Sequence, residues 1–165
     1  MKRLTLLRHA KSDWSLPDQA DWDRALNKRG QRDAPEMARR LRERKLKPGL
    51  MVSSPAVRAL TTATMVARKL KVPATCVLQD ERLYLASPKD MLQVIQATPR
   101  DVEHLMVVGH NPGMTELANL LSAGERIDNL PTCGYFTAVF KIADWMDLAA
   151  EEGREAIFDY PKNPA

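Results

Sequence analysis

The sequence predicts an α/β domain with a mainly parallel central sheet. Short runs rich in β-branched and apolar residues alternate along the chain with longer segments in which apolar residues recur at helical spacing. Such alternation is typical of strands joined by crossover helices. With 165 residues, the chain has the size of one ordinary domain and can bury a sizeable core. We therefore expect one domain over residues 1–165, built as a three-layer α/β/α sandwich.

Six short segments are expected to form the strands. They are RLTLLR (3–8), LMVS (50–53), TCVLQ (75–79), LMVVG (105–109), YFTAVFK (135–141) and, with a weaker pattern, EAIFDY (155–160). Three apolar stripes predict helices that pack on the sheet: Ala34, Met37, Ala38 and Leu41; Leu60, Ala63, Ala67 and Leu70; and Met114, Leu117, Ala118 and Leu121. The tail, about residues 161–165, is expected to be loosely ordered.

Composition argues against several classes of protein. Hydrophobic residues make up 44% and charged residues 28% of the chain, close to globular averages. No apolar run approaches the roughly 18 residues of a membrane span, and the amino terminus has no signal-like apolar stretch. We therefore expect a cytoplasmic protein that does not bind membranes. Cys76 and Cys133 lack the spacing of a disulfide framework or a zinc site.

The net charge of +4 is modest. Its densest basic stretch is ARRLRERKLK at 38–47, whose charges wrap around a helix while Leu41 faces inward. No aromatic residues interleave with these charges to stack on bases, so we expect a solvated helix face and no nucleic-acid binding. The charge supports only a weak attraction to acidic or phosphorylated partners.

Polar residues and prolines follow three of the predicted strands at their carboxyl ends. They are Arg8 and His9 after the first strand, Ser54, Pro55 and Arg58 after the second, and His110, Asn111 and Pro112 after the fourth. Ser54 is expected to cap a helix that begins at Pro55. In a parallel sheet such ends meet at one crevice. If the strands are neighbours, the two arginines and two histidines converge there, where helix N-termini favour an anion such as phosphate.

Each of these residues also has a structural interpretation. Taken alone, an arginine is more often a surface ion-pair partner, and a histidine near a strand end is more often structural than catalytic. However, two of the three histidines directly follow predicted strands, whereas His104 lies before its strand and is expected at the surface. Metal binding by His9 and His110 is not expected because no third ligand at suitable spacing accompanies either one.

The stretch 11–30 is the only long irregular segment before the first predicted helix. It carries Trp14 and Trp22 among many charges. A loop of this length in a compact domain is often functional, so we expect it to form a rim or lid.

Three motifs together resemble the signatures of the histidine phosphatase superfamily, which has the phosphoglycerate mutase-like fold. They are LLRHA (6–10), VSSPAVRALTTA (52–63) and VVGHNPG (107–113). Within that superfamily, RHAKSDW (8–14) and LPTCG (130–134) resemble the small bacterial SixA-type phosphohistidine phosphatases. The similarity runs from near residue 1 to about residue 142.

This resemblance implies a role for each residue of the convergent group. His9 would be the nucleophile that takes the phosphoryl group, and Arg8 and Arg58 would hold its oxygens. His110 would be the second histidine beside the phosphorus, acting in its protonated form as a donor. Water would then hydrolyse the phosphorylated His9. No metal or other cofactor is implied.

Glu81 is the candidate general acid, because QDERLYLAS (79–87) resembles the family segment that carries one. The alternative is that Glu81 pairs with Arg82 or Arg58. SixA-type members are thought to lack a firmly placed acid, and an imidazole leaving group, with a pKa near ~6.5, needs less help than an alkoxide. Lys11 stands where the wider family has a carboxylate; it either faces the phosphate or is solvated.

Three functions follow from these expectations. The first is a phosphatase acting on phosphohistidine in a partner protein, because a short chain has little length for a cap that encloses a small substrate. The second is hydrolysis of a small phosphorylated metabolite, in which Glu81 would be essential. The third is a non-catalytic phosphate-binding module. We expect a monomer or a weak dimer.

Overall fold

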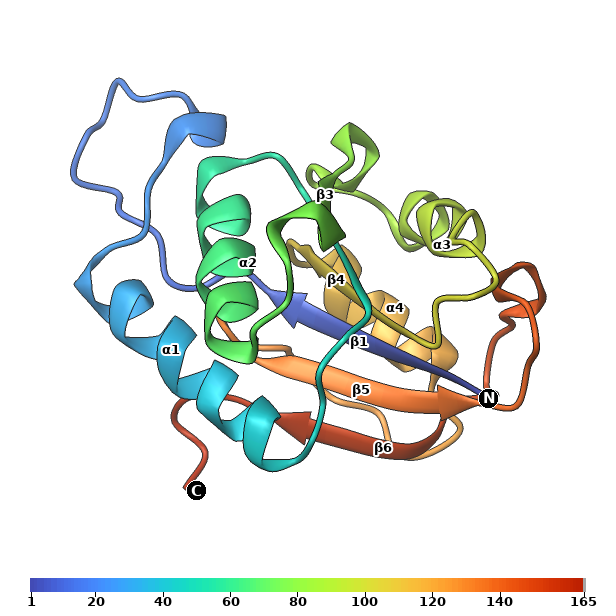
Figure 1. The fold of residues 1–165 in the computed structure, drawn as a ribbon. Helices are drawn as coiled ribbons and strands as arrows, with labels where there is room; N and C mark the ends of the chain where they lie inside the picture. The colour runs from blue at the N-terminus through green and yellow to red at the C-terminus, as the bar shows by residue number, and fades with distance from the viewer. Residues whose placement is uncertain (165) are drawn as a thin grey trace.

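The computed structural model describes residues 1–164, so the end of the predicted loose tail, Ala165, lies outside the described residues. Within them, one six-stranded sheet has the order β3-β2-β4-β1-β5-β6 (Figure 1). The strands are β1 (Lys2–Arg8), β2 (Leu50–Ser53), β3 (Val77–Gln79), β4 (His104–Gly109), β5 (Tyr135–Phe140) and β6 (Arg154–Asp159). The first four run parallel, and β5 runs antiparallel to its neighbours β1 and β6.

Helices cover both faces of this sheet, which gives the expected three layers (Figure 1). The α-helices of the described chain are α1 (Lys28–Glu43), α2 (Val57–Leu70), α3 (Pro88–Gln96) and α4 (Gly113–Leu121). Short 3-10 turns lie at η1 (Asp21–Asp23), η2 (Ala74–Cys76), η3 (Glu81–Leu83) and η4 (Trp145–Asp147). None of the helices in residues 1–164 is long and apolar enough to cross a membrane.

Two hydrophobic cores lie on opposite faces of the sheet, because successive side chains of a strand point to opposite faces. In β1, Leu6 packs into the core under α3 and α4, whereas Leu7 packs into the core under α1 and α2. Val107 and Val108 of β4 divide in the same way. Burial on both faces explains why these central strands are continuously apolar in sequence.

The structure confirms the six predicted strands and three predicted helices, and it adds and corrects details. Helix α3 was not expected; Ser87 caps it by accepting from the Asp90 amide. His104 is not a surface residue: it begins β4, is half-buried, and its Nε2 lies 2.8 Å from Thr5 Oγ1. Ser54 is not the cap of α2, which begins at Val57.

Strand β4 lies between β1 and β2, so the ends of all three strands meet at one edge of the sheet. The segment after β4 therefore lies beside the segments after β1 and β2. This topology brings together motifs that are about 50 residues apart in the chain.

Candidate active site

The two arginines and two histidines singled out from the sequence line one cavity of about 290 Å³. Arg8 and His9 come from the end of β1, Arg58 from the first turn of α2, and His110 from the end of β4. The ring centroids of the two histidines are 5.2 Å apart. In residues 1–164, no group of three or more His, Cys, Asp or Glu side chains could hold a metal ion.

His9 is fixed in one tautomer. Its Nδ1 lies 2.8 Å from the Ala10 carbonyl oxygen, which can only accept, so Nδ1 carries the proton and Nε2 carries the lone pair. Burial lowers the pKa of His9 to about 3. The imidazole is therefore neutral at neutral pH, as a nucleophilic nitrogen must be.

Helix α2 holds the backbone that follows His9. The Ala10 amide donates to Thr62 Oγ1 at 3.0 Å, and the same hydroxyl donates to the Arg58 carbonyl at 2.7 Å. The His9 amide and carbonyl are also paired, with Gly109 and Cys133 respectively. Because Thr62 contacts both segments, it ties the position of His9 to the helix that carries Arg58.

Arg8 keeps donors that face no protein acceptor. One terminal nitrogen donates to the Leu130 carbonyl at 3.0 Å, while its buried Nε has no hydrogen-bond partner among the described residues. Burial also lowers the pKa of Arg8, although the group stays charged. A guanidinium with a buried donor that lacks a protein acceptor is a suitable site for an anion.

Arg58 is buried and contacts both Asp21 and His110. Its Nη1 donates to the Asp21 carbonyl oxygen at 2.7 Å, and its Nη2 donates to Asp21 Oδ2 at 2.9 Å. Nη2 also lies 3.3 Å from Nδ1 of His110. Arg58 therefore stands between Asp21 and the second histidine.

His110 is neutral in this structure. Arginine can only donate, so Nδ1 of His110 accepts from Arg58 and the proton lies on Nε2, which donates to Ser54 Oγ at 2.8 Å. Burial, together with the charge of Arg58, lowers the pKa of His110 to about 4. This contact also gives Ser54 its role: its hydroxyl supports His110 instead of capping a helix.

Segment 11–30 supplies residues to the cavity that the sequence did not single out. Asp21 binds Arg58 and also accepts from Arg24 at 2.8 Å and from the Tyr84 hydroxyl. Burial alone would raise the pKa of Asp21, but the hydrogen bonds from Tyr84 and Arg58 outweigh it and hold this pKa below its usual value. Asp21 is therefore an anion that organises the cavity. The signal for it was the concentration of charges and tryptophans in an irregular stretch.

Lys11 also lines the cavity, as does Ser12. The Ser12 hydroxyl is occupied by Arg24, whereas Lys11 is half-buried. Its role, whether it faces the phosphate or is solvated, stays a prediction.

Glu81 lies outside the residues that line the cavity. It is exposed on η3. Neither expected ion pair forms among the described residues, because Arg82 pairs with Asp80 and Arg58 pairs with Asp21. The geometry thus gives Glu81 no contact with the group that surrounds His9.

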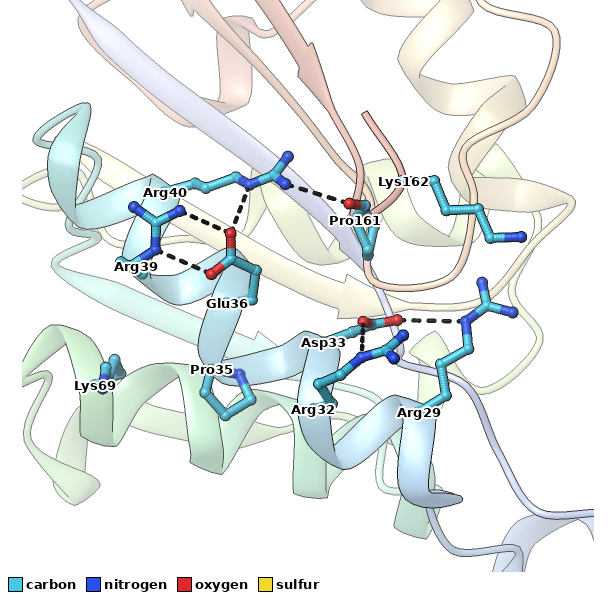
Figure 2. Close-up of a pocket in the computed structure, with 10 residues that line it drawn as sticks. All are labelled: Arg29, Arg32, Asp33, Pro35, Glu36, Arg39, Arg40, Lys69, Pro161 and Lys162. Carbon is cyan, nitrogen blue, oxygen red and sulfur yellow. Dashed lines mark hydrogen bonds and ion pairs between the residues drawn. The ribbon is translucent and has the colours of Figure 1, made fainter. Parts of the chain in front are cut away.

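A larger hollow of about 580 Å³ lies along α1 and is called here the α1 pocket (Figure 2). It is lined by α1, by Lys69 of α2 and by the segment after β6, and six of its side chains are cationic. Figure 2 shows Arg39 and Arg40 turned to Glu36, to which both donate. Arg40 also binds Asp159, which lies outside the pocket lining. No histidine or cysteine lines it, so it offers no nucleophile of the kind found in the cavity.

Comparison with known proteins agrees with a phosphate-handling site. The model of the histidine phosphatase superfamily (branch 1) matches residues 4–84. An uncharacterized protein of Mycobacterium leprae is 32% identical over 168 residues, which cover 94% of this chain and 100% of that relative. A solved structure from Agrobacterium tumefaciens, named as a candidate phosphohistidine phosphatase SixA, is 30% identical with a TM-score of 0.75, covering 85% of this chain and 92% of that chain.

More distant structures share the fold. The protein histidine phosphatase SixA in complex with tungstate has a TM-score of 0.75 at 21% identity, over 96% of this chain and 94% of that chain. A mycobacterial glucosyl-3-phosphoglycerate phosphatase has a TM-score of 0.66 at 19% identity, over 100% of both chains.

The family match and the similarity to the Agrobacterium tumefaciens structure identify the class of protein as a phosphatase. The chain belongs to the histidine phosphatase superfamily, and its fold is the phosphoglycerate mutase-like fold.

Proposed function

We propose that the chain hydrolyses phosphohistidine in a partner protein through a phosphorylated His9. The observation that carries this proposal is the state of His9: a neutral imidazole whose Nε2 lone pair is free, in a cavity that it shares with Arg8 and Arg58. Such a nitrogen can attack phosphorus while the guanidiniums hold the phosphoryl oxygens.

In the first step, the Nε2 lone pair of His9 forms a bond to phosphorus as the phosphorus–nitrogen bond of the substrate breaks. The other ring nitrogen of the substrate phosphohistidine carries a proton, so the electron pair of that bond returns to a ring that leaves as neutral imidazole, whose conjugate acid has a pKa of ~6.5. In the second step, water attacks phosphorus, the bond between phosphorus and Nε2 of His9 breaks, and its electron pair returns to Nε2. The proton that the attacking water loses passes to a phosphoryl oxygen, so that inorganic phosphate leaves as its monoanion.

The arginines and His110 respond to the charge of the phosphoryl group. Arg8 offers its free Nε donor, and the phosphoryl oxygens compete with Asp21 for the terminal nitrogens of Arg58. A dianion in the cavity favours protonation of His110, because a nearby opposite charge raises the pKa of an imidazole. His110 then serves as the protonated donor in the complex only.

Two observations favour phosphohistidine over a small phosphomonoester. An alkoxide leaving group requires an acid, and Glu81 is exposed outside the cavity while Asp21 is ionised. The similarity to the Agrobacterium tumefaciens protein, which is named for phosphohistidine, supports the same choice. A purely phosphate-binding module would have no need for the single tautomer that leaves Nε2 of His9 free.

Phosphate release from a phosphohistidine-bearing protein, measured beside a panel of phosphomonoesters with chelator present, tests the proposal. We expect a preference for phosphohistidine that is lost in His9→Ala, with no phosphorylated enzyme trapped in that variant. His104→Gln is the matched control, because His104 lies outside the cavity. Preference for the monoesters would favour the metabolite hypothesis, and no turnover of either would favour a binding module.

A further inference from the structure

Two exposed apolar side chains line the otherwise polar cavity. Trp14 is 70% exposed and Leu85 is 56% exposed, and they come from two segments far apart in the chain. In Figure 1 both segments, the loop after β1 and the connection between β3 and α3, lie in the upper half of the view. Scattered exposed apolar residues are ordinary, but two at one catalytic opening suggest a contact surface.

Trp14 is held in place by the residues around the cavity. The Arg24 guanidinium carbon lies 3.2 Å from the centroid of the indole ring. Arg24 is itself buried and is fixed by Asp21, Ser12 and the Asp13 carbonyl. One face of the indole is thus occupied by Arg24, while most of the side chain stays in contact with solvent.

Leu85 is presented by a strained backbone. Its φ is 48°, in the left-handed region that a leucine rarely adopts. Its neighbours are anchored: Leu83 is buried, and the Ala86 carbonyl packs so closely on Gly113 that a Cβ there would collide with it. The surrounding structure thus maintains a strained backbone at a residue whose apolar side chain is exposed beside the cavity. Strain of this kind is typical of functional positions.

We propose that Trp14 and Leu85 form an apolar rim that docks a protein segment with apolar side chains flanking the phosphohistidine. This inference rests on the proposed function and specifies the partner surface. A small phosphorylated metabolite rich in hydroxyl groups would find polar partners in the cavity but none on this indole and leucine. Apolar residues beside a phosphohistidine would instead be removed from water on contact with the rim.

Two synthetic phosphohistidine peptides of equal length and charge test the rim, one with leucines and one with serines on both sides of the histidine. For the wild type we expect kcat/KM about tenfold higher with the leucine peptide. The ratio should approach one in Trp14→Ala and in Leu85→Ala. Leu85→Gly separates the effect of the side chain from that of the strained backbone. Glycine adopts a positive φ without strain but, like alanine, lacks the apolar side chain, so we expect it to give the same ratio as Leu85→Ala.

Met146→Ala is the matched control, because Met146 is 65% exposed and lies outside the cavity lining. It should keep the wild-type ratio. Equal hydrolysis of both peptides by the wild type, or a ratio that survives both rim variants, would overturn the rim while leaving the proposed function standing. Hydrolysis of neither peptide by the wild type would overturn both.

Discussion

The cavity and the α1 pocket both gather arginines, and the pocket is the larger, at about 580 Å³ against about 290 Å³. In the α1 pocket, Arg39 donates to Glu36 and Glu43 along its own helix, and Arg40 binds Asp159. In the cavity, Arg58 is buried, and Arg8 keeps a buried donor without a partner among the described residues.

The difference shows that neither volume nor the number of arginines marks the functional site. The pairs of Arg39 with Glu36 and Glu43 lie along one helix and are exposed to solvent, and such ion pairs contribute little to stability. A buried donor left without an acceptor is costly in the folded chain, so its presence beside a neutral His9 points to a ligand that supplies the acceptor. Phosphoryl oxygens are acceptors of that kind.

The sharpest way to test this comparison is to make the same substitution in both places. We expect Arg58→Lys to lower kcat/KM about a thousandfold, because lysine keeps the charge but cannot donate two parallel hydrogen bonds. Arg39→Lys in the α1 pocket should change kcat/KM by less than about twofold. Thermal unfolding of both variants would show that the fold is intact. Equal losses would mean that the α1 pocket takes part in the reaction.

Acid pH should destabilise the folded chain through its three histidines, two of which line the cavity and none of which lines the α1 pocket. The folded pKa is about 3 for His9 and about 4 for His104 and His110, all below the unfolded value of ~6.5. Between these values the unfolded chain binds more protons, so stability is greatest above pH ~6.5 and is lost as the pH falls. We expect the free energy of unfolding, measured with urea, to fall by about 5 kcal/mol between pH 7 and pH 5.

Two variants show which residues cause this loss of stability at acid pH. His9→Asn should reduce the pH dependence by about a third, because unfolding near pH 5 would then take up about two protons on histidines instead of about three. Glu36→Gln in the α1 pocket should leave it unchanged over this range, since hydrogen bonds from Arg39 and Arg40 hold the pKa of Glu36 at about 2. A stability that does not change between pH 7 and pH 5 would show that the folded histidines reach solvent.

The sequence predicted the six strands and located His9, Arg58 and His110 because these features depend on local pattern. Apolar runs specify strands, and the ends of parallel strands share an edge wherever the sheet order brings them together. The α2 boundary was wrong because Ser54 carries a typical cap side chain that the fold uses for His110. Sequence alone cannot show whether a serine hydroxyl will bond to a helix amide or to a side chain from another segment.

Asp21 and Glu81 show a further limit of prediction from sequence, which cannot place the side chains of irregular segments. Both are acids in irregular segments, and motif resemblance favoured Glu81, yet it is Asp21 that contacts Arg58. The path of the loop before α1 decides this outcome, and it depends on tertiary contacts such as the bond from Tyr84 to Asp21. The contact between Arg58 and His110 likewise joins residues 52 positions apart, so it too depends on the tertiary fold.

The smallest effect that we predict concerns Thr62, which connects His9 to α2. Thr62→Val keeps the shape of the side chain but leaves the buried Ala10 amide without its acceptor, which costs about 1–3 kcal/mol of stability. We expect kcat to fall about tenfold with little change in KM, because Thr62 positions the nucleophile without touching the substrate. Thr62→Ser should restore most of the rate.

Thr64 on the same helix is the matched control. Its hydroxyl also donates to the carbonyl four residues earlier, at 2.8 Å from Leu60, but it is exposed and accepts nothing from the segment after His9. Thr64→Val should therefore leave kcat unchanged. A loss of rate in both variants would trace the effect to the helix itself, and a loss in neither would show that the Ala10 carbonyl keeps His9 in place without help from α2.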